Sequence, residues 1–79
     1  MNIKKKLIQF LSQYGKIEYL RFVGDECQFK IILDIPISNM TTDEFTIFLM
    51  KITDSILTDY PNFKEFKNDD KSISVIMTK

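Results

Sequence analysis

The apolar residues at the start of the chain recur with the spacing of a helix. They stand three, four or seven positions apart, with lysines and glutamines filling the other side: Ile3, Leu7, Ile8, Phe10, Leu11 and Tyr14. This periodicity predicts an amphipathic helix. Asn2 is placed to cap its start, and Gly15 is placed to end it in a left-handed conformation.

A β-hairpin is predicted to follow. The segment "KIEYLRFV" is rich in β-branched and aromatic residues, and "GDE" supplies a turn. The returning strand alternates between two faces. One face holds Cys27, Phe29, Ile31, Leu33 and Ile35, and the other holds Gln28, Lys30, Ile32 and Asp34. Pro36 is expected to end this strand because proline cannot donate to a sheet ladder.

The second helix has the strongest start signal in the sequence. Thr41 and Glu44 have the spacing of a capping box, and Met40 and Phe45 have that of a hydrophobic staple. An apolar stripe then continues until Pro61, through Phe45, Phe48, Leu49, Ile52, Ile56, Leu57 and Tyr60. We therefore interpret "DIPISNMTTDEF" as a turn into a capped helix. An anion site is disfavoured there, because Asp43 and Glu44 would repel an anion.

The tail predicts one strand, with Ile73, Val75 and Met77 on one face. "FKEFK" is either a further short strand or a single turn of helix, because Phe63 and Phe66 differ in parity. The expected fold is a single α+β domain over residues 1–79. Two helices cover one face of a three- or four-stranded sheet, in the order α-β-β-α-β(-β).

The composition narrows the functional classes. The chain is 44% hydrophobic and 28% charged, and its eleven basic residues balance eleven acidic ones. This balance is not that of a general nucleic-acid binder. One cysteine excludes an internal disulfide framework and suits a reducing compartment. No stretch has the length of a membrane span or the form of a secretory signal, so we expect a cytoplasmic protein without membrane association.

No residue is a strong candidate for catalysis. The chain has no histidine, and Cys27 shares the parity of buried neighbours. The acidic pairs Asp25–Glu26, Asp43–Glu44 and Asp69–Asp70 fall in predicted turns or at a cap. We therefore predict no enzyme activity, no cofactor and no metal site. The cluster Lys4, Lys5 and Lys6 is either a solvated helix face or a weak nucleic-acid contact.

Surplus apolar residues give the one positive indication of function. Either parity of the first strand leaves apolar side chains outside: Ile17, Tyr19 and Val23, or Leu20 and Phe22. We predict a partner-binding surface made of Leu20, Phe22, Ile32 and Ile76 on the sheet and Ile47 and Met50 on the second helix. Scattered surface hydrophobes or a strand bulge are the competing explanations.

The predicted elements come in the order helix–strand–strand–helix–strand, with "IILDI" before the second helix and "YPNFKEF" after it. In these features the chain resembles the NifU-like iron–sulfur scaffold domains. In that family a proline after the second helix precedes apolar residues, here Pro61, Phe63 and Phe66. The resemblance implies a similar fold. The family's cluster-binding cysteines lie between the second strand and second helix, where this chain has "PISNMTT" and no cysteine. The resemblance therefore implies no cluster.

We accordingly expect a small non-catalytic protein-binding module, an adaptor or an inhibitor of a larger assembly. Its partner is another protein or a second copy of the chain, in a homo-oligomer. A degenerate iron–sulfur carrier without a cluster is one alternative. Weak nucleic-acid binding through the helix of Lys4–Lys6 is the other.

Overall fold

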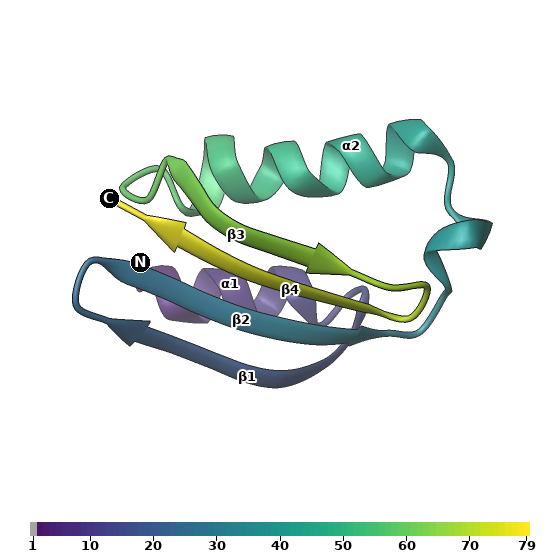
Figure 1. Ribbon diagram of the computed structural model, residues 1–79, viewed down its shortest axis with the longest axis horizontal. Coiled ribbons are helices and arrows are strands. Elements are labelled where there is room, and N and C mark those ends of the chain that lie inside the picture. Colours follow the sequence, from purple (N-terminus) through teal and green to yellow (C-terminus); the bar gives the residue numbers. More distant parts are fainter. Residues whose placement is uncertain (1) are drawn as a thin grey trace.

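The computed structural model describes residues 2–79, and its elements follow the order helix–strand–strand–helix–strand–strand (Figure 1). They are α1 (Ile3–Leu11), β1 (Gly15–Val23), β2 (Glu26–Leu33), α2 (Thr42–Lys51), β3 (Asn62–Asn68) and β4 (Ser72–Thr78). A 3-10 turn, η1 (Ile37–Asn39), precedes α2, and a π-helical turn, η2 (Ile52–Ile56), extends it. The predicted α+β class is confirmed, and the sheet has four strands.

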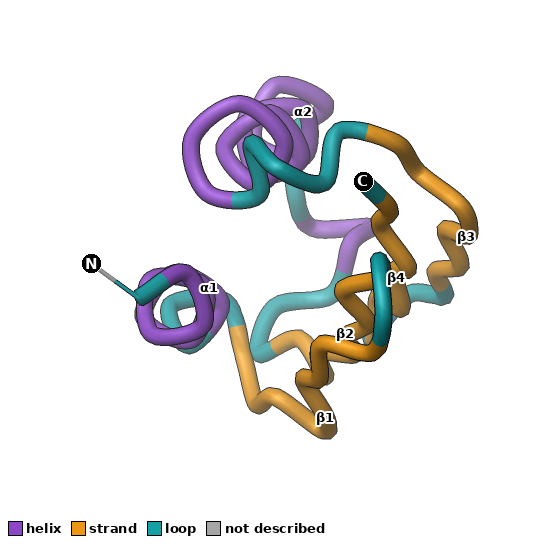
Figure 2. Tube along the Cα trace, turned by 90° about the vertical axis from the view of Figure 1, so that its left-hand side faces the viewer, coloured by secondary structure: helices purple, strands orange, loops and turns teal. Residues whose placement is uncertain are grey.

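The sheet is antiparallel throughout, with strand order β1-β2-β4-β3. Strands β1 and β3 are therefore its two edges. Both helices lie on the same side of the sheet (Figure 2). We call the side that they cover the inner face and the opposite side the outer face.

The first helix is shorter than its apolar pattern predicted. Asn2 caps it, since its Oδ1 accepts a hydrogen bond from the backbone N–H of Lys4 at 2.8 Å. The prediction for Gly15 is wrong: α1 ends at Leu11, and Gly15 opens β1 without a positive φ. A Cβ at Gly15 would overlap the carbonyl oxygen of Ile32. Glycine is required here because the two backbones approach closely.

The hairpin between β1 and β2 turns at Gly24 and Asp25, as predicted. Gly24 has a φ of 58°, and no other residue in the described range 2–79 has a positive φ. Glycine at the first central position is typical of a type II′ turn. The expectation that Ile35 continues the buried face of β2 is wrong. The strand ends at Leu33, so Ile35 is exposed.

The start of α2 confirms the predicted cap. The backbone N–H of Glu44 donates to Thr41 Oγ1 at 3.0 Å. The Glu44 carboxylate accepts a hydrogen bond from the Thr41 hydroxyl at 3.1 Å. In a complete capping box it would accept one from the backbone N–H of Thr41 instead. The junction is therefore a capped helix start, as the sequence indicated.

The end of this helix departs from a regular α-helix. The N–H of Leu57 donates to the carbonyl of Ile52, five residues back, at 2.7 Å. This π turn holds one more residue than an α turn, which rotates Leu57 towards the sheet. Leu57 is consequently buried, although regular helical spacing from Phe48 would place it off the core.

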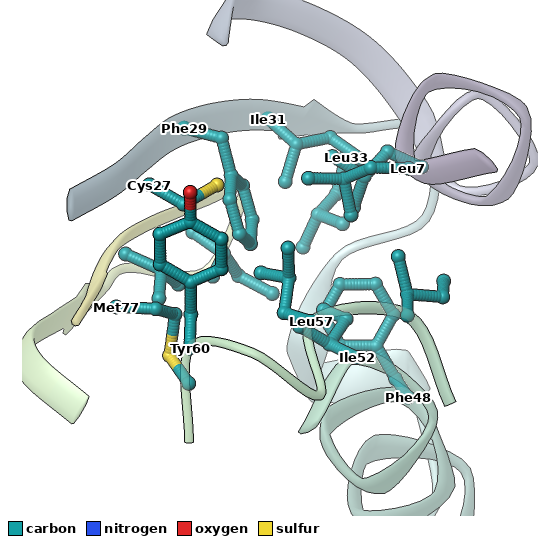
Figure 3. Packing of buried hydrophobic residues seen from close by; sticks show 14 residues of the cluster. Leu7, Cys27, Phe29, Ile31, Leu33, Phe48, Ile52, Leu57, Tyr60 and Met77 are labelled. Carbon is teal, nitrogen blue, oxygen red and sulfur yellow. The ribbon is translucent and has the colours of Figure 1, made fainter. Parts of the chain in front are cut away.

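The core forms one cluster between the sheet and the helices (Figure 3). Strands β2 and β4 contribute alternate residues, and α1, α2 and the segment after α2 cover them. The fully buried members are Leu7, Leu11, Cys27, Phe29, Ile31, Phe48, Ile52, Leu57, Ile73, Val75 and Met77. Phe48 also joins the two helices, with ring centroids 5.5 Å from Phe10 and 4.7 Å from Tyr14.

Candidate protein-binding surface

The first strand carries a β-bulge that resolves its ambiguous pattern. Ile17 pairs with Ile31 and Tyr19 with Lys30, so Glu18 is an extra residue between them. Such a bulge shifts the parity of the strand. Ile17 before the bulge and Leu20 and Phe22 after it therefore all point to the inner face.

This bulge corrects the prediction for Leu20 and Phe22. They lie opposite the buried residues Phe29 and Cys27, and they pack against the core. They therefore do not belong to the outer face. The alternative that the sequence left open, a strand bulge, is what the structure shows.

The outer face is mainly polar. Glu18 and Lys30 form an ion pair at 3.1 Å, and Glu65 and Lys67 form another at 2.9 Å. Lys64 pairs with Glu26, which lowers the pKa of that carboxyl through the hydrogen bond. The Arg21 guanidinium lies 4.5 Å from the ring centroid of Tyr19. These contacts are exposed to solvent, and each of them contributes little to the stability of the fold.

Ile32 and Ile76 do lie on this face, but they are not neighbours. Ile32 is opposite Ser72, and Ile76 is opposite Gln28. Ser72 and Ile76 are four positions apart on β4, a distance of about 13 Å along the strand. They are isolated hydrophobes within a polar surface, so the predicted apolar patch on the outer face is not formed.

The second helix keeps its predicted exposed residues. Ile47 is 60% exposed and Met50 is 53% exposed. They stand three positions apart and share one side of α2, pointing away from the buried Phe48. A shallow hollow of about 210 Å³ lies beside them, bordered by Lys51, Asp54 and Ser55.

The edge strand β3 adds two exposed aromatic side chains that the sequence left unassigned. A bulge at Lys64 brings Phe63 and Phe66 to the same inner face, with ring centroids 6.1 Å apart. The helices do not fully cover them, and 46% of Phe63 and 36% of Phe66 remain exposed. Phe66 also packs edge-on against Phe45 of α2.

A groove of about 380 Å³ lies beside Phe45. Its lining comes from η1, the start of α2 and the end of β3: Ile37, Ser38, Met40, Thr41, Thr42, Phe45, Thr46 and Asn68. None of these residues is charged, although charged residues make up 28% of the chain. The centre of a protein interface is typically poor in charged residues and rich in residues such as Phe and Met. We call this groove with Phe63 and Phe66 the α2–β3 surface. Ile47 and Met50 lie outside it, on the side of α2 that is turned away from Phe45.

The groove is held by contacts between distant segments. The backbone N–H of Ser38 donates to Asp70 Oδ1 at 2.9 Å, and that of Ile37 donates to the Asp70 carbonyl at 2.8 Å. These bonds fasten η1 to the β3–β4 turn. The groove is thus fixed on both sides before any partner binds.

Both edges of the sheet are unsuited to strand addition. β1 carries its bulge at Glu18, and β3 carries one at Lys64. Bulges and charged side chains on edge strands are devices that discourage pairing with another strand. Contacts through side chains are therefore favoured over contacts through the exposed main chain.

The remaining candidate groups are the single thiol, the acidic side chains of the turns and the lysine cluster. Cys27 is buried, and burial raises the pKa of its thiol to about 11. Between residues 2 and 79, no group of three metal-ligating side chains comes together. Asp69 accepts the Lys71 backbone N–H, which lowers the pKa of its carboxyl. Lys4, Lys5 and Lys6 are exposed on α1.

Comparison with protein-family models, with curated proteins and with solved structures finds no match to this chain. In the part of the chain that the structure describes, no helix is both long enough and apolar enough to span a membrane.

Proposed function

We propose that this protein is a small, non-catalytic, cytoplasmic module that binds another protein through the α2–β3 surface. The observation that carries the proposal is the uncharged groove beside Phe45, with the part-exposed ring of Phe66 against Phe45 and that of Phe63 beside Phe66. Exposed aromatic side chains commonly anchor a protein interface, and hollows beside them receive side chains of the partner. An adaptor or an inhibitor of a larger assembly fits a chain of this size.

The partner is expected to dock through side chains. Both sheet edges are bulged and charged, which disfavours an added strand. An apolar segment laid between α2 and β3 would instead cover Phe45, Phe63 and Phe66. Recognition of an amphipathic helix by an apolar groove is a common mode of this kind.

A different protein is favoured over a second copy of this chain. The buried residues form one cluster inside a single chain, so folding does not require a second copy to complete the core. A standard interface buries about 800 Å² on each partner, roughly a sixth of the 4940 Å² surface of this chain. A partner of standard size would therefore cover only about a sixth of the surface of a chain whose core is already complete.

The test compares two matched variants in quantitative affinity capture from host lysate. Phe63→Ser with Phe66→Ser removes both exposed rings, whereas Val23→Ser removes an apolar side chain that is 53% exposed and lies outside the α2–β3 surface. We expect a captured protein that is lost from the double variant and retained by the control. Equal capture by all three forms would contradict the proposal.

Solution mass by light scattering separates the two kinds of partner. A monomer is expected across the concentration range, because the core is complete within a single chain. A stable dimer that Phe63→Ser with Phe66→Ser dissociates would keep the surface but make a second copy its partner. A dimer that only Val23→Ser dissociates would show that the interface lies outside the α2–β3 surface.

A further inference from the structure

A second, smaller pocket lies at the junction that leads into α2. Its volume is about 240 Å³, below the range of about 300–1,000 Å³ that is typical of small-molecule sites. Its size therefore suits a single side chain better than a complete ligand. Tyr14, Leu33, Ile35 and Met40 provide its apolar walls.

The charged groups at this pocket are of one sign, beside the neutral amide of Gln13. Asp34 and Glu44 border it, and no basic residue lines it. Neither carboxylate takes part in an ion pair within residues 2–79. The last turn of α1, which ends just before Gln13 and Tyr14, also contains no basic residue. The negative end of that helix is therefore not neutralised by a cation of its own.

The walls are held in place before any ligand arrives. The Tyr14 ring packs edge-on against Phe48, with centroids 4.7 Å apart. The backbone N–H of Asp34 donates to the Tyr14 carbonyl at 2.9 Å, which joins the end of β2 to the end of α1. The Glu44 side chain is fixed by its bond to the Thr41 hydroxyl. A preformed pocket reduces the entropic cost of binding.

We propose that this pocket receives a lysine or arginine side chain from a partner protein. Basic side chains have a long apolar stem and a charged head. The stem would lie against Leu33 and Met40, and the head would meet Asp34 and Glu44. Apolar walls bordered by two carboxylates and by no basic residue are complementary to this shape and charge.

The position of the pocket extends the proposed function. Met40 lines both this pocket and the uncharged groove, so the two hollows are neighbours. A partner segment crossing Met40 would place an apolar residue in the groove and a basic residue in the pocket. The inference rests on the proposed function in naming the partner's chemistry, but the pocket can be tested without the partner.

The probes are the capped tripeptides Gly-Arg-Gly and Gly-Lys-Gly, titrated to about 10 mM against ¹⁵N-labelled protein, the range expected for one anchored side chain. Gly-norleucine-Gly keeps the apolar stem without the charge, and Gly-Glu-Gly reverses the charge. We expect the basic peptides to shift the amide signals of Tyr14, Asp34 and Met40. Norleucine should bind about tenfold more weakly or worse, because it lacks charged hydrogen bonds.

The matched variant is Asp34→Asn with Glu44→Gln. Glutamine is accepted at this position of a capping box, so the helix start is retained. We expect the shifts from basic peptides to disappear in this variant and to persist in Asp54→Asn, whose carboxylate lies outside the pocket. An unchanged spectrum elsewhere confirms folding.

Three results would overturn the inference: no shift at the highest concentration, equal shifts from norleucine, or shifts that survive Asp34→Asn with Glu44→Gln. None of these would affect the outcome of partner capture by the Phe63 and Phe66 variant. Loss of that capture with intact peptide binding would likewise leave the pocket in place. The two proposals therefore fail separately.

Discussion

The ring of Phe66 in β3 packs edge-on against the ring of Phe45 in α2, with 6.2 Å between centroids and 89° between planes. This contact connects the edge strand to the helix that covers the sheet. Edge-on aromatic pairs contribute about 0.5–1.5 kcal/mol beyond the area they bury. The contact leaves one side of Phe66 exposed, so the same ring supports the fold and remains accessible to a partner.

Phe66→Ala is expected to lower the free energy of unfolding by about 1 kcal/mol, the centre of the range for ordinary substitutions. Phe48→Ala should lower it by about 3–5 kcal/mol, because Phe48 is only 1% exposed and its removal opens a cavity. Denaturant unfolding of both variants measures the difference. An equal cost would mean that Phe66 is a core residue and not a surface anchor.

Gly15→Ala is expected to destabilise the fold by about 1–3 kcal/mol, because its new methyl group meets the backbone of Ile32. Lys16→Ala, at the next and exposed position, should change stability by about 0.5 kcal/mol or less. Thermal and denaturant unfolding of the pair provide the test. A neutral Gly15→Ala would show that the strands do not approach as closely as described.

Periodicity and capping in the sequence were sufficient to predict both helices, the hairpin and the strand of Ile73, Val75 and Met77. These features depend on local spacing, which the sequence shows directly. The bulges at Glu18 and Lys64 were not predicted, because an extra residue reverses the parity that identifies a face. The π turn escaped prediction for a similar reason, since it adds one residue to the helical repeat.

The candidate surface was predicted only in part. Ile47 and Met50 were predicted to be exposed because they depart from the stripe of the second helix, and both are exposed. Leu20 and Phe22 were assigned to the wrong face because the bulge in β1 was unknown. Phe63 and Phe66 were missed as surface residues, although their difference in parity was the signal of a bulge. The hollows beside Met40 depend on tertiary packing, and no local pattern indicates them.

The buried thiol of Cys27 should make stability depend on alkaline pH. Its pKa is raised from 9.0 to about 11 in the folded protein, because burial disfavours the thiolate. The unfolded chain therefore loses its proton first. This contribution to stability is complete below pH 9.0 and is lost as the pH rises towards about 11. Plots of the free energy of unfolding against pH for wild type and Cys27→Ala should converge or cross over this range. Parallel plots would contradict the burial of the thiol.

The ion pair between Lys64 and Glu26 should be visible in the titration of the carboxyl. The hydrogen bond from Lys64 lowers the pKa of Glu26 below 4.5. The pair therefore contributes stability above pH 4.5, and the contribution is lost as the pH falls through the lowered pKa. Lys64→Met should raise the Glu26 pKa, measured by NMR titration. Lys67→Met, which removes the partner of Glu65, should leave it unchanged.

Site-specific photo-crosslinking in the native host shows whether a protein partner contacts the α2–β3 surface. A photoreactive phenylalanine analogue replaces Phe63 in one form of the protein and Val23 in another, because both positions are exposed. We expect a discrete crosslinked product with a different protein from position 63 and none from position 23. Crosslinking from position 23 alone, or no product from position 63, would contradict this expectation.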